Sequence, residues 1–299
     1  MTALTRDAAR PAIVAGVLMM LVGILMFSLN DVMGKWLVAT YTVGQLLVIR
    51  SGAALLVLAP WVIRAGVPSM LGVERPGLQV ARVVVSTLEV ALFYWVVIYL
   101  PLADAMTYWL AGPIWVVIIA AIVLRERVTA PRWGAVFLGF VGVVIALSPT
   151  QNAFSWPVAA ALLGSLLFAV MNVIARQLKA TSDLALVFWQ NVGALLMGLA
   201  LIPWGWTTPS LLDLALLSLL GVVAMVAHMC VTRSLKLAPA SVVTPYQYTL
   251  IIWAVLFGWL VFADVPTLSM LIGSGIIIVA GIVLFWLEQS SADTSVHPP

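Results

Sequence analysis

Charged residues are scarce in this chain. Only 8% of its 299 residues are Asp, Glu, Lys or Arg, whereas 64% are hydrophobic. A soluble domain carries about 25% charged residues, which cover its water-facing surface. The shortage of charge excludes an ordinary soluble domain and predicts an all-α integral membrane protein whose surroundings are the lipid bilayer.

Cysteine is nearly absent too. The single cysteine, Cys230, excludes an internal disulfide and a cysteine-built metal site. His228 precedes it by two residues, and helical side chains at that spacing point in different directions. The sequence also lacks the Gly-x-Ser-x-Gly, His-Glu-x-x-His and Gly-x-x-x-x-Gly-Lys motifs. We therefore expect no enzyme activity, no cofactor and no metal, so any driving force must come from a gradient or from the membrane potential.

Long apolar runs are what the chain has in abundance. A spanning helix needs about 20 mainly apolar residues. Ten segments meet that length: 12–33, 43–64, 79–99, 103–124, 130–148, 156–178, 184–204, 211–234, 239–262 and 267–287. Short polar links join them and leave no room for a soluble domain.

The basic residues predict the orientation, because Lys and Arg collect in cytoplasmic loops. Twelve of the 14 fall on one side if both termini are cytoplasmic: Arg6, Arg10, Arg64, Arg75, Arg82, Arg125, Arg127, Arg132, Arg176, Lys179, Arg233 and Lys236. Lys35 falls on the other side, and Arg50 lies within the second segment. Since these basic residues lie between apolar segments and not along one face, the net charge of +3 does not indicate nucleic-acid binding.

The chain also contains an internal repeat. FSLNDVMGKWL at 27–37 resembles FAVMNVIARQL at 168–178, and RSGAAL at 50–55 resembles NVGALL at 191–196, in both cases 141 residues apart. We divide the chain into a first repeat at 1–150, a second at 151–288 and a polar tail at 289–299. Each repeat holds five segments, an odd number, so the second must enter the membrane from the opposite face. Inverted repeats are typical of secondary transporters with a substrate site between the halves. Duplication in a protein that is not a transporter is the alternative.

These features resemble the drug/metabolite transporter superfamily, and its EamA-type branch in particular. The resemblance rests on ten helices in two inverted halves, on Asn30-Asp31 near the outer end of the first segment, and on the small residues that begin the fourth and ninth segments. Within that branch the chain looks like the YddG-type exporters of aromatic and other neutral amino acids. The resemblance implies export of a small metabolite, most simply an amino acid, across the bacterial inner membrane. A carrier of nucleotide sugars or cationic drugs and a non-transporting membrane protein remain as alternatives.

Charges inside a bilayer are costly, so each one marks a functional candidate. Asp31 and Arg50 lie in the outer thirds of adjacent segments, where an ion pair would either gate the outer mouth or fasten two helices together. Glu89 lies near the middle of the third segment, where it either couples a proton or only packs. His228 offers a proton relay or a hydrogen-bonded packing residue. The repeat mates of Asp31 and Arg50 are Asn172 and Asn191, which predict a second polar cluster near the inner mouth.

Proline interrupts the two aromatic-rich segments. Pro113 and Pro245 each remove a backbone hydrogen bond, and the freed carbonyl groups are tolerated where they are bonded again or line a cavity. We therefore expect a pocket that takes a bulky apolar group. The expected substrate-binding residues are Asn30, Glu89, Tyr94, Tyr108, Trp109, Asn172, His228, Tyr246, Gln247 and Tyr248, and the expected gating residues are Asp31, Arg50, Pro113 and Pro245. Small residues such as Gly134 and Gly142 predict close helix packing or a dimer contact in the fifth segment, so a monomer and a homodimer are both left open.

Overall fold

Helices make up the fold in the computed structural model, which describes residues 9–100, 102–125, 128–147, 156–262 and 268–293. Those ranges contain no strand. The first half holds α2 (Ala9–Val38), α3 (Val43–Ala65), α4 (Val67–Leu71), α5 (Pro76–Tyr99), α6 (Leu102–Trp109), α7 (Gly112–Ile119), the π-helical turn η1 (Ala120–Leu124) and α8 (Ala130–Leu147). The second half holds α9 (Trp156–Gln177), α10 (Asp183–Leu201), the 3₁₀ turn η2 (Ile202–Trp204), α11 (Leu211–Leu237), α12 (Ala240–Val243), the 3₁₀ helix η3 (Thr244–Thr249), α13 (Leu250–Phe262) and α14 (Leu268–Asp293).

Six of the described helices are long and apolar enough to cross a membrane. They are Pro11–Val38, Val43–Ala65, Pro76–Tyr99, Trp156–Gln177, Asp183–Trp204 and Leu211–Leu237. The other four expected segments also fall on helical stretches, although two of them are broken and the count of ten spans stays a prediction. Helix α14 continues to Asp293, so the first residues of the expected polar tail are helical. The expected boundary between the halves, at 150, lies outside the described residues.

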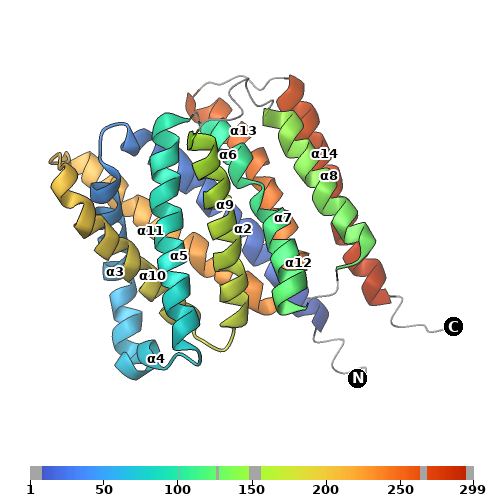
Figure 1. Ribbon diagram of the computed structural model, residues 1–299, viewed down its shortest axis with the longest axis horizontal. Coiled ribbons are helices and arrows are strands. Elements are labelled where there is room, and N and C mark those ends of the chain that lie inside the picture. The colour runs from blue at the N-terminus through green and yellow to red at the C-terminus, as the bar shows by residue number, and fades with distance from the viewer. Residues whose placement is uncertain (1–8, 101, 126–127, 148–155, 263–267, 294–299) are drawn as a thin grey trace.

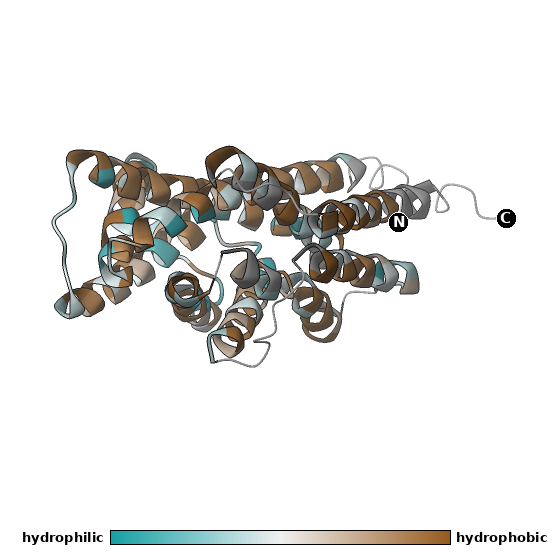
Figure 2. Cartoon of the chain, turned by 90° about the horizontal axis from the view of Figure 1, so that it is seen from above, coloured by the Kyte–Doolittle hydropathy of each residue, from teal (hydrophilic) through white to brown (hydrophobic). Residues whose placement is uncertain are grey.

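Hydrophobic residues make up most of the length of the described helices (Figure 2), and many large apolar side chains are exposed. Leu56 is 76% exposed, Ile63 is 78% exposed and Leu211 is 88% exposed. A water-soluble monomer rarely exposes so much contiguous apolar surface. The exposed side chains therefore face lipid, as the composition predicts.

Helices from the two halves interleave. Helix α2 packs along α11, α5 along α9, α3 along α10, and α8 along α14 (Figure 1). Glycine permits the α2–α11 approach, because a Cβ on Gly23 would lie 2.8 Å from Val231 of α11. It also permits a contact between α9 and α6, because a Cβ on Gly164 would lie 1.9 Å from the Trp109 ring. Gly142 likewise closes the α8–α14 contact, since its Cβ would lie 2.9 Å from the carbonyl oxygen of Gly273. The fifth and tenth segments thus pack on each other at Gly142, whereas a Cβ on Gly134 would meet nothing within 4 Å, and a dimer contact stays a prediction.

The fourth and ninth segments are interrupted, as their prolines predict. Helix α6 ends at Trp109 and α7 begins at Gly112, with Pro113 in its first turn. In the ninth segment Pro245 lies in the first turn of η3. Proline carries no backbone N–H, so a continuous α-helical hydrogen-bond ladder cannot pass through it. Both breaks lie at the depth of a central cavity.

Polar contacts join the two halves at one end of the bundle. The Gln45 side chain donates to the carbonyl oxygen of Thr207 at 2.5 Å and accepts from its N–H at 2.9 Å. The Tyr41 hydroxyl donates to the Asp213 carboxylate at 2.7 Å, and this bond raises the pKa of Tyr41. These contacts hold the α2–α3 link against the start of α11.

Candidate functional site

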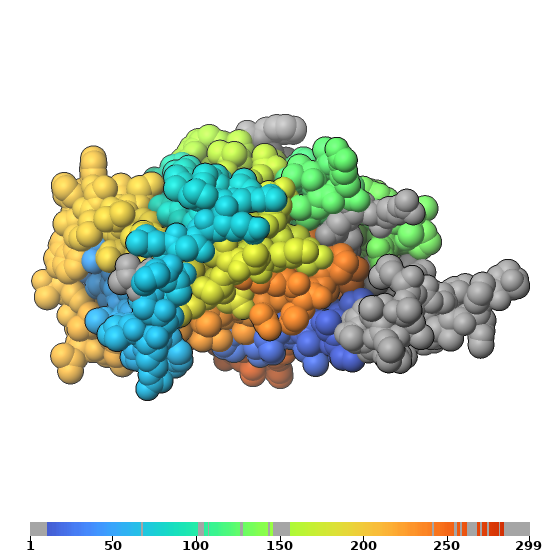
Figure 3. Space-filling model, turned by 90° about the horizontal axis from the view of Figure 1, so that it is seen from below, coloured from blue at the N-terminus to red at the C-terminus, as the bar shows by residue number. Residues whose placement is uncertain are grey.

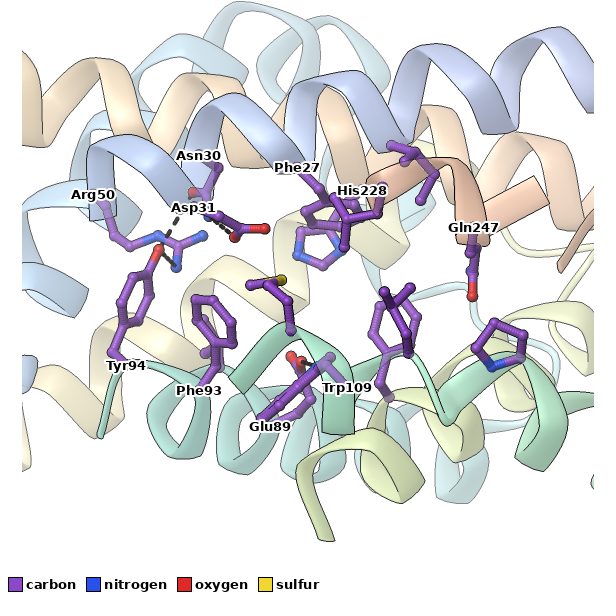
Figure 4. A pocket seen from close by; sticks show the side chains of 17 residues that line it. Phe27, Asn30, Asp31, Arg50, Glu89, Phe93, Tyr94, Trp109, His228 and Gln247 are labelled. Atoms are coloured by element: carbon purple, nitrogen blue, oxygen red, sulfur yellow. Dashed lines mark hydrogen bonds between the residues drawn. The ribbon is translucent and has the colours of Figure 1, made fainter. Parts of the chain in front are cut away.

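A cavity of about 70 Å³ lies between the halves, and Figure 4 shows the side chains around it. Its wall is mostly apolar and aromatic, with polar groups placed between the rings. The lining residues are Ile24, Phe27, Asn30, Asp31, Arg50, Glu89, Val90, Phe93, Tyr94, Met106, Trp109, Leu110, Pro113, Phe168, His228, Gln247 and Leu250. Nine of the fourteen expected site residues are among them.

A chain of hydrogen bonds orders the charged groups at one end of the cavity. Arg50 Nη1 donates to the Tyr94 hydroxyl at 3.0 Å, and that hydroxyl donates to Asn30 Oδ1 at 3.3 Å. The Asn30 amide then donates to Asp31 Oδ1 at 3.2 Å (Figure 4). The guanidinium also lies 5.3 Å from the centre of the Tyr94 ring. Tyr94 and Asn30 therefore connect Arg50 to Asp31.

The direct ion pair between Asp31 and Arg50 is not formed, which corrects one expectation. Among the described residues, the ion pairs are those of Asp183 with Arg233 and Lys236. The Tyr94 ring fits beside Gly34, where a Cβ would lie 2.7 Å from Tyr94 Cε1. Sequence reasoning placed the two charges in adjacent helices correctly but did not foresee that a tyrosine from α5 would reach between them.

Glu89 is held on the opposite wall. It is buried, and Trp109 Nε1 donates to its Oε1 at 3.1 Å. The Trp109 ring packs edge-on against Phe93, with ring centres 5.2 Å apart, and it fits over the bare face of Gly164. The carboxyl thus has a fixed position from which it can accept hydrogen bonds from a cationic group.

His228 lies between the two ends of the site. Its ring packs edge-on against Phe27, with centres 4.8 Å apart and an interplanar angle of 84°. Gln247 lies at the end of the cavity away from Arg50 (Figure 4). Its side-chain nitrogen and oxygen are both buried without a hydrogen-bond partner among the described residues. A buried amide of this kind is costly unless something bonds to it, so Gln247 is suited to contact a ligand.

Five expected site residues lie outside this cavity: Tyr108, Asn172, Pro245, Tyr246 and Tyr248. Successive residues of a 3₁₀ helix are about 120° apart, so when Gln247 faces inward its neighbours point elsewhere. Tyr246 packs on the cluster around Met20 of α2, whereas Tyr248 packs on the cluster around Val136 of α8. Neither tyrosine lines this cavity, and their expected contact with the substrate stays a prediction.

The apolar lining residues were missed by sequence reasoning. Phe27, Phe93, Met106 and Phe168 line the cavity, and no charge or proline marks them. One signal was present, because Phe27 and Phe168 are repeat mates 141 residues apart. Their rings meet edge-on with centres 6.3 Å apart.

A second polar cluster surrounds Arg82. The sequence places this arginine among the flanking basic residues, but it is 1% exposed within α5. Its guanidinium donates to the carbonyl oxygen of Leu186 at 2.9 Å, to Gln190 Oε1 at 3.0 Å and to Thr232 Oγ1 at 3.5 Å. These contacts involve neither Asn172 nor Asn191, so the second cluster expected around those two repeat mates stays a prediction. Asn191, the repeat mate of Arg50, instead bonds its own helix at the carbonyl oxygen of Val187.

Comparison with known proteins identifies the family. The model of the EamA-like transporter family matches the chain twice, at residues 14–148 and 155–287. The chain belongs to the EamA-like transporter family. It is therefore a multi-pass membrane protein of a family whose members are transporters and not enzymes.

Bacterial relatives of this family carry different substrates. The chain is 25% identical to an S-adenosylmethionine uptake transporter of Rickettsia prowazekii, over 92% of this chain and 94% of the relative. It is 28% identical to a riboflavin transporter of Rhizobium johnstonii, over 93% of each chain. It is 26% identical to a pseudopaline exporter of Pseudomonas aeruginosa, over 90% of this chain and 95% of the relative.

A solved crystal structure shares the fold. It superposes with a TM-score of 0.79 at 15% identity, over 92% of this chain and 98% of the other. The comparisons give no specific support to the YddG-type export of aromatic amino acids, because these relatives carry other classes of substrate.

Proposed function

We propose that this protein transports a small zwitterionic or cationic metabolite that carries a flat ring, with S-adenosylmethionine as the first candidate. One observation carries the proposal. The cavity sets two carboxyl groups, Asp31 and Glu89, against the single guanidinium of Arg50, and surrounds them with aromatic rings. Aromatic faces and carboxylates both attract cations, and a lone arginine suits a carboxylate.

S-adenosylmethionine matches this arrangement group by group. Its sulfonium and ammonium are cationic, its amino-acid head carries one carboxylate, and its adenine is flat. Arg50 would bind the carboxylate, Glu89 a cationic centre, and Phe93 with Trp109 the ring. Relatives with this substrate cover nearly the whole chain, which supports the proposal. A neutral flat molecule such as riboflavin is the second candidate, because the aromatic wall alone accommodates it. Export of phenylalanine or tryptophan ranks below both.

We also propose that two inverted five-helix repeats, ten spans in all, rock about this cavity. The doubled family match supports the repeat. The packing supports a two-fold relation, because exchanging the halves turns the α2–α11 contact into the α9–α5 contact. The start of α2 and the end of α14 lie at the same end of the bundle, in keeping with both termini being cytoplasmic at the inner membrane (Figure 1).

The cavity is small for its task. Small-molecule sites typically measure about 300–1,000 Å³, whereas this cavity measures about 70 Å³. The helices must therefore move apart to admit a substrate. Pro113 and Gln247 lie at the helix breaks, where such movement costs the least backbone hydrogen bonding.

Uptake of labelled S-adenosylmethionine into proteoliposomes tests the proposal. We expect saturable uptake, with riboflavin and phenylalanine as competitors. Glu89→Gln keeps the shape of the side chain but removes its charge, and should reduce uptake of S-adenosylmethionine at least about tenfold, because a charged hydrogen bond contributes about 1.5–3 kcal/mol.

Two comparisons make this experiment decisive. Uptake of riboflavin should change little in Glu89→Gln, because the molecule has no cationic centre. Glu74→Gln is the matched control, since Glu74 is exposed on the link before α5. Uptake of riboflavin but not of S-adenosylmethionine would establish the second candidate, and uptake of phenylalanine alone would restore the amino-acid carrier.

A further inference from the structure

Buried polar side chains continue the cavity wall toward one end of the bundle. On α11, Thr232 lies one turn after His228 and is 2% exposed. On α9, Asn172 lies one turn after Phe168, is 1% exposed, and its Nδ2 has no hydrogen-bond partner among the described residues. Residues four apart share a helix face, so both continue the lining downward from the cavity.

Helix α5 contributes the longest part of this row of buried polar side chains, which we call the polar track. Gln79, Arg82, Ser86 and Glu89 follow at intervals of three, four and three residues, so they share one face, and all four are buried. Glu89 lies in the cavity, and Arg82 lies about 10 Å below it along the helix axis. The face that lines the cavity therefore stays polar almost to the start of α5.

Arg82 is poorly satisfied for a buried cation. Its three acceptors, on Leu186, Gln190 and Thr232, are all uncharged. Its Nε is buried without a partner, and so are both polar atoms of the Gln79 side chain among the described residues. A guanidinium has five N–H donors and is costly to bury without a counter-ion. A purely structural side chain at this depth would not need a charge.

The surroundings add positive charge and little negative charge. Lys236 lies within electrostatic reach of Arg82. The carboxylate of Asp183 is already shared, because it lies 2.6 Å from Lys236 Nζ and 3.6 Å from Arg233 Nη1. In the described part of the chain no carboxylate pairs with Arg82. The track therefore has an excess of positive charge that a bound anion would neutralise.

We propose that Arg82 forms a second substrate subsite, which binds a carboxylate or similar anionic group of the transported molecule as it passes between the cavity and this end. The proposal rests on the transport function but not on which substrate is carried. Binding requires α5 to separate from α10 and α11, which breaks the three bonds of Arg82 and leaves its guanidinium free. Seen from this end, the cyan start of α5 lies against the yellow segments of the second half (Figure 3).

A cysteine in the track reports on its charge. The natural Cys230 is first replaced by Ala, and Ser86→Cys then places a thiol one turn from Arg82, with almost no change in size. Ser86 is fully buried and donates only to the carbonyl oxygen of Val83 at 3.0 Å. The protein is placed in lipid nanodiscs, where both faces meet the reagent. The probes are two methanethiosulfonates of similar size, one with a sulfonate group and one with a trimethylammonium group.

The ratio of the two reaction rates measures the preference for an anion. We expect Arg82→Gln to lower the ratio of sulfonate to trimethylammonium rates about tenfold, because a fixed charge in a narrow low-dielectric path concentrates counter-ions. Arg82→Lys should keep most of the preference. Gln190→Glu provides an independent variant. It gives Arg82 a carboxylate where Gln190 Oε1 now lies 3.0 Å away, so the protein should still fold. It should abolish the preference for the anionic reagent, as Arg82→Gln does.

Other outcomes overturn the proposal. If Arg82 only fastens the helices, Arg82→Gln raises both rates together and leaves their ratio unchanged. If neither reagent reaches the Ser86→Cys thiol, the track does not open and no subsite exists there. Failure of S-adenosylmethionine uptake would be a separate result, because neither probe is a substrate.

Discussion

The Tyr94 hydroxyl is the connection on which the order of the charged residues depends. It accepts from Arg50 and donates to Asn30, so both sides of the hydrogen-bond chain pass through one oxygen atom. Tyr94→Phe removes that oxygen and keeps the ring beside Gly34. A buried hydrogen bond to a charged group contributes about 1.5–3 kcal/mol. We expect substrate to bind about tenfold more weakly, measured as Kd by thermal-shift titration of the purified protein.

Tyr99→Phe is the control for that change. Tyr99 lies in the same helix, is 55% exposed, and packs on Trp95 and Trp156 through its ring. Its loss of a hydroxyl should leave Kd unchanged. Equal effects of the two substitutions would show that Tyr94 does not order the site.

The Tyr41–Asp213 contact predicts a dependence of stability on pH. The hydrogen bond to the Asp213 carboxylate raises the pKa of Tyr41 above its ordinary value of 10.0. A group whose pKa is raised on folding stabilises the protein below its unfolded pKa, and this contribution is lost as the pH rises through the folded pKa. The wild type should therefore have a higher Tm than Tyr41→Phe near neutral pH, and the difference should shrink above pH 10.0. A difference that does not change with pH would contradict the proposed cause.

At the scale of the elements, glycine sets how closely α3 and α11 cross. A Cβ on Gly221 would lie 1.9 Å from the backbone carbonyl oxygen of Arg50, which no side-chain rotation can relieve. Gly221→Ala must push the helices apart, and overpacking of this kind costs about 1–3 kcal/mol or more. We expect Tm to fall by several degrees and Arg50 to shift in the cavity wall. Gly52→Ala in α3 meets nothing within 4 Å and should leave Tm unchanged or raise it.

The helices themselves could be predicted because a bilayer requires an apolar stretch of fixed length. Polar cavity residues could also be predicted from the properties of the bilayer. Placing Asp31, Arg50 or Glu89 within the membrane costs free energy, so each of them marks a functional candidate. The phenylalanines of the lining could not be predicted. Phe27 in the cavity and Trp36 on the lipid side are both apolar, and hydropathy does not distinguish the interior of the bundle from the bilayer.

Arg82 shows a second limit of sequence reasoning. Its position near the start of a segment is typical of a flanking residue at the membrane surface, and the sequence does not say that α10 and α11 cover it. Its guanidinium bonds to Leu186 and Gln190 of α10 and to Thr232 of α11. Burial by a neighbouring element depends on the tertiary arrangement, so it could be found only from the structure.

At the scale of the whole molecule, the inverted repeat requires corresponding loops to face opposite sides of the membrane. The link between α3 and α5 should be cytoplasmic and the link between α10 and α11 periplasmic, because each repeat contains an odd number of spans. Ser69 and Thr208 are exposed positions on these two links. In a Cys230→Ala background, a membrane-impermeant maleimide should label Thr208→Cys but not Ser69→Cys in intact spheroplasts, and the reverse in inverted vesicles. Labelling of both cysteines from the same side would rule out the inverted arrangement, because that arrangement places five spans, an odd number, between the two links and so puts them on opposite sides of the membrane.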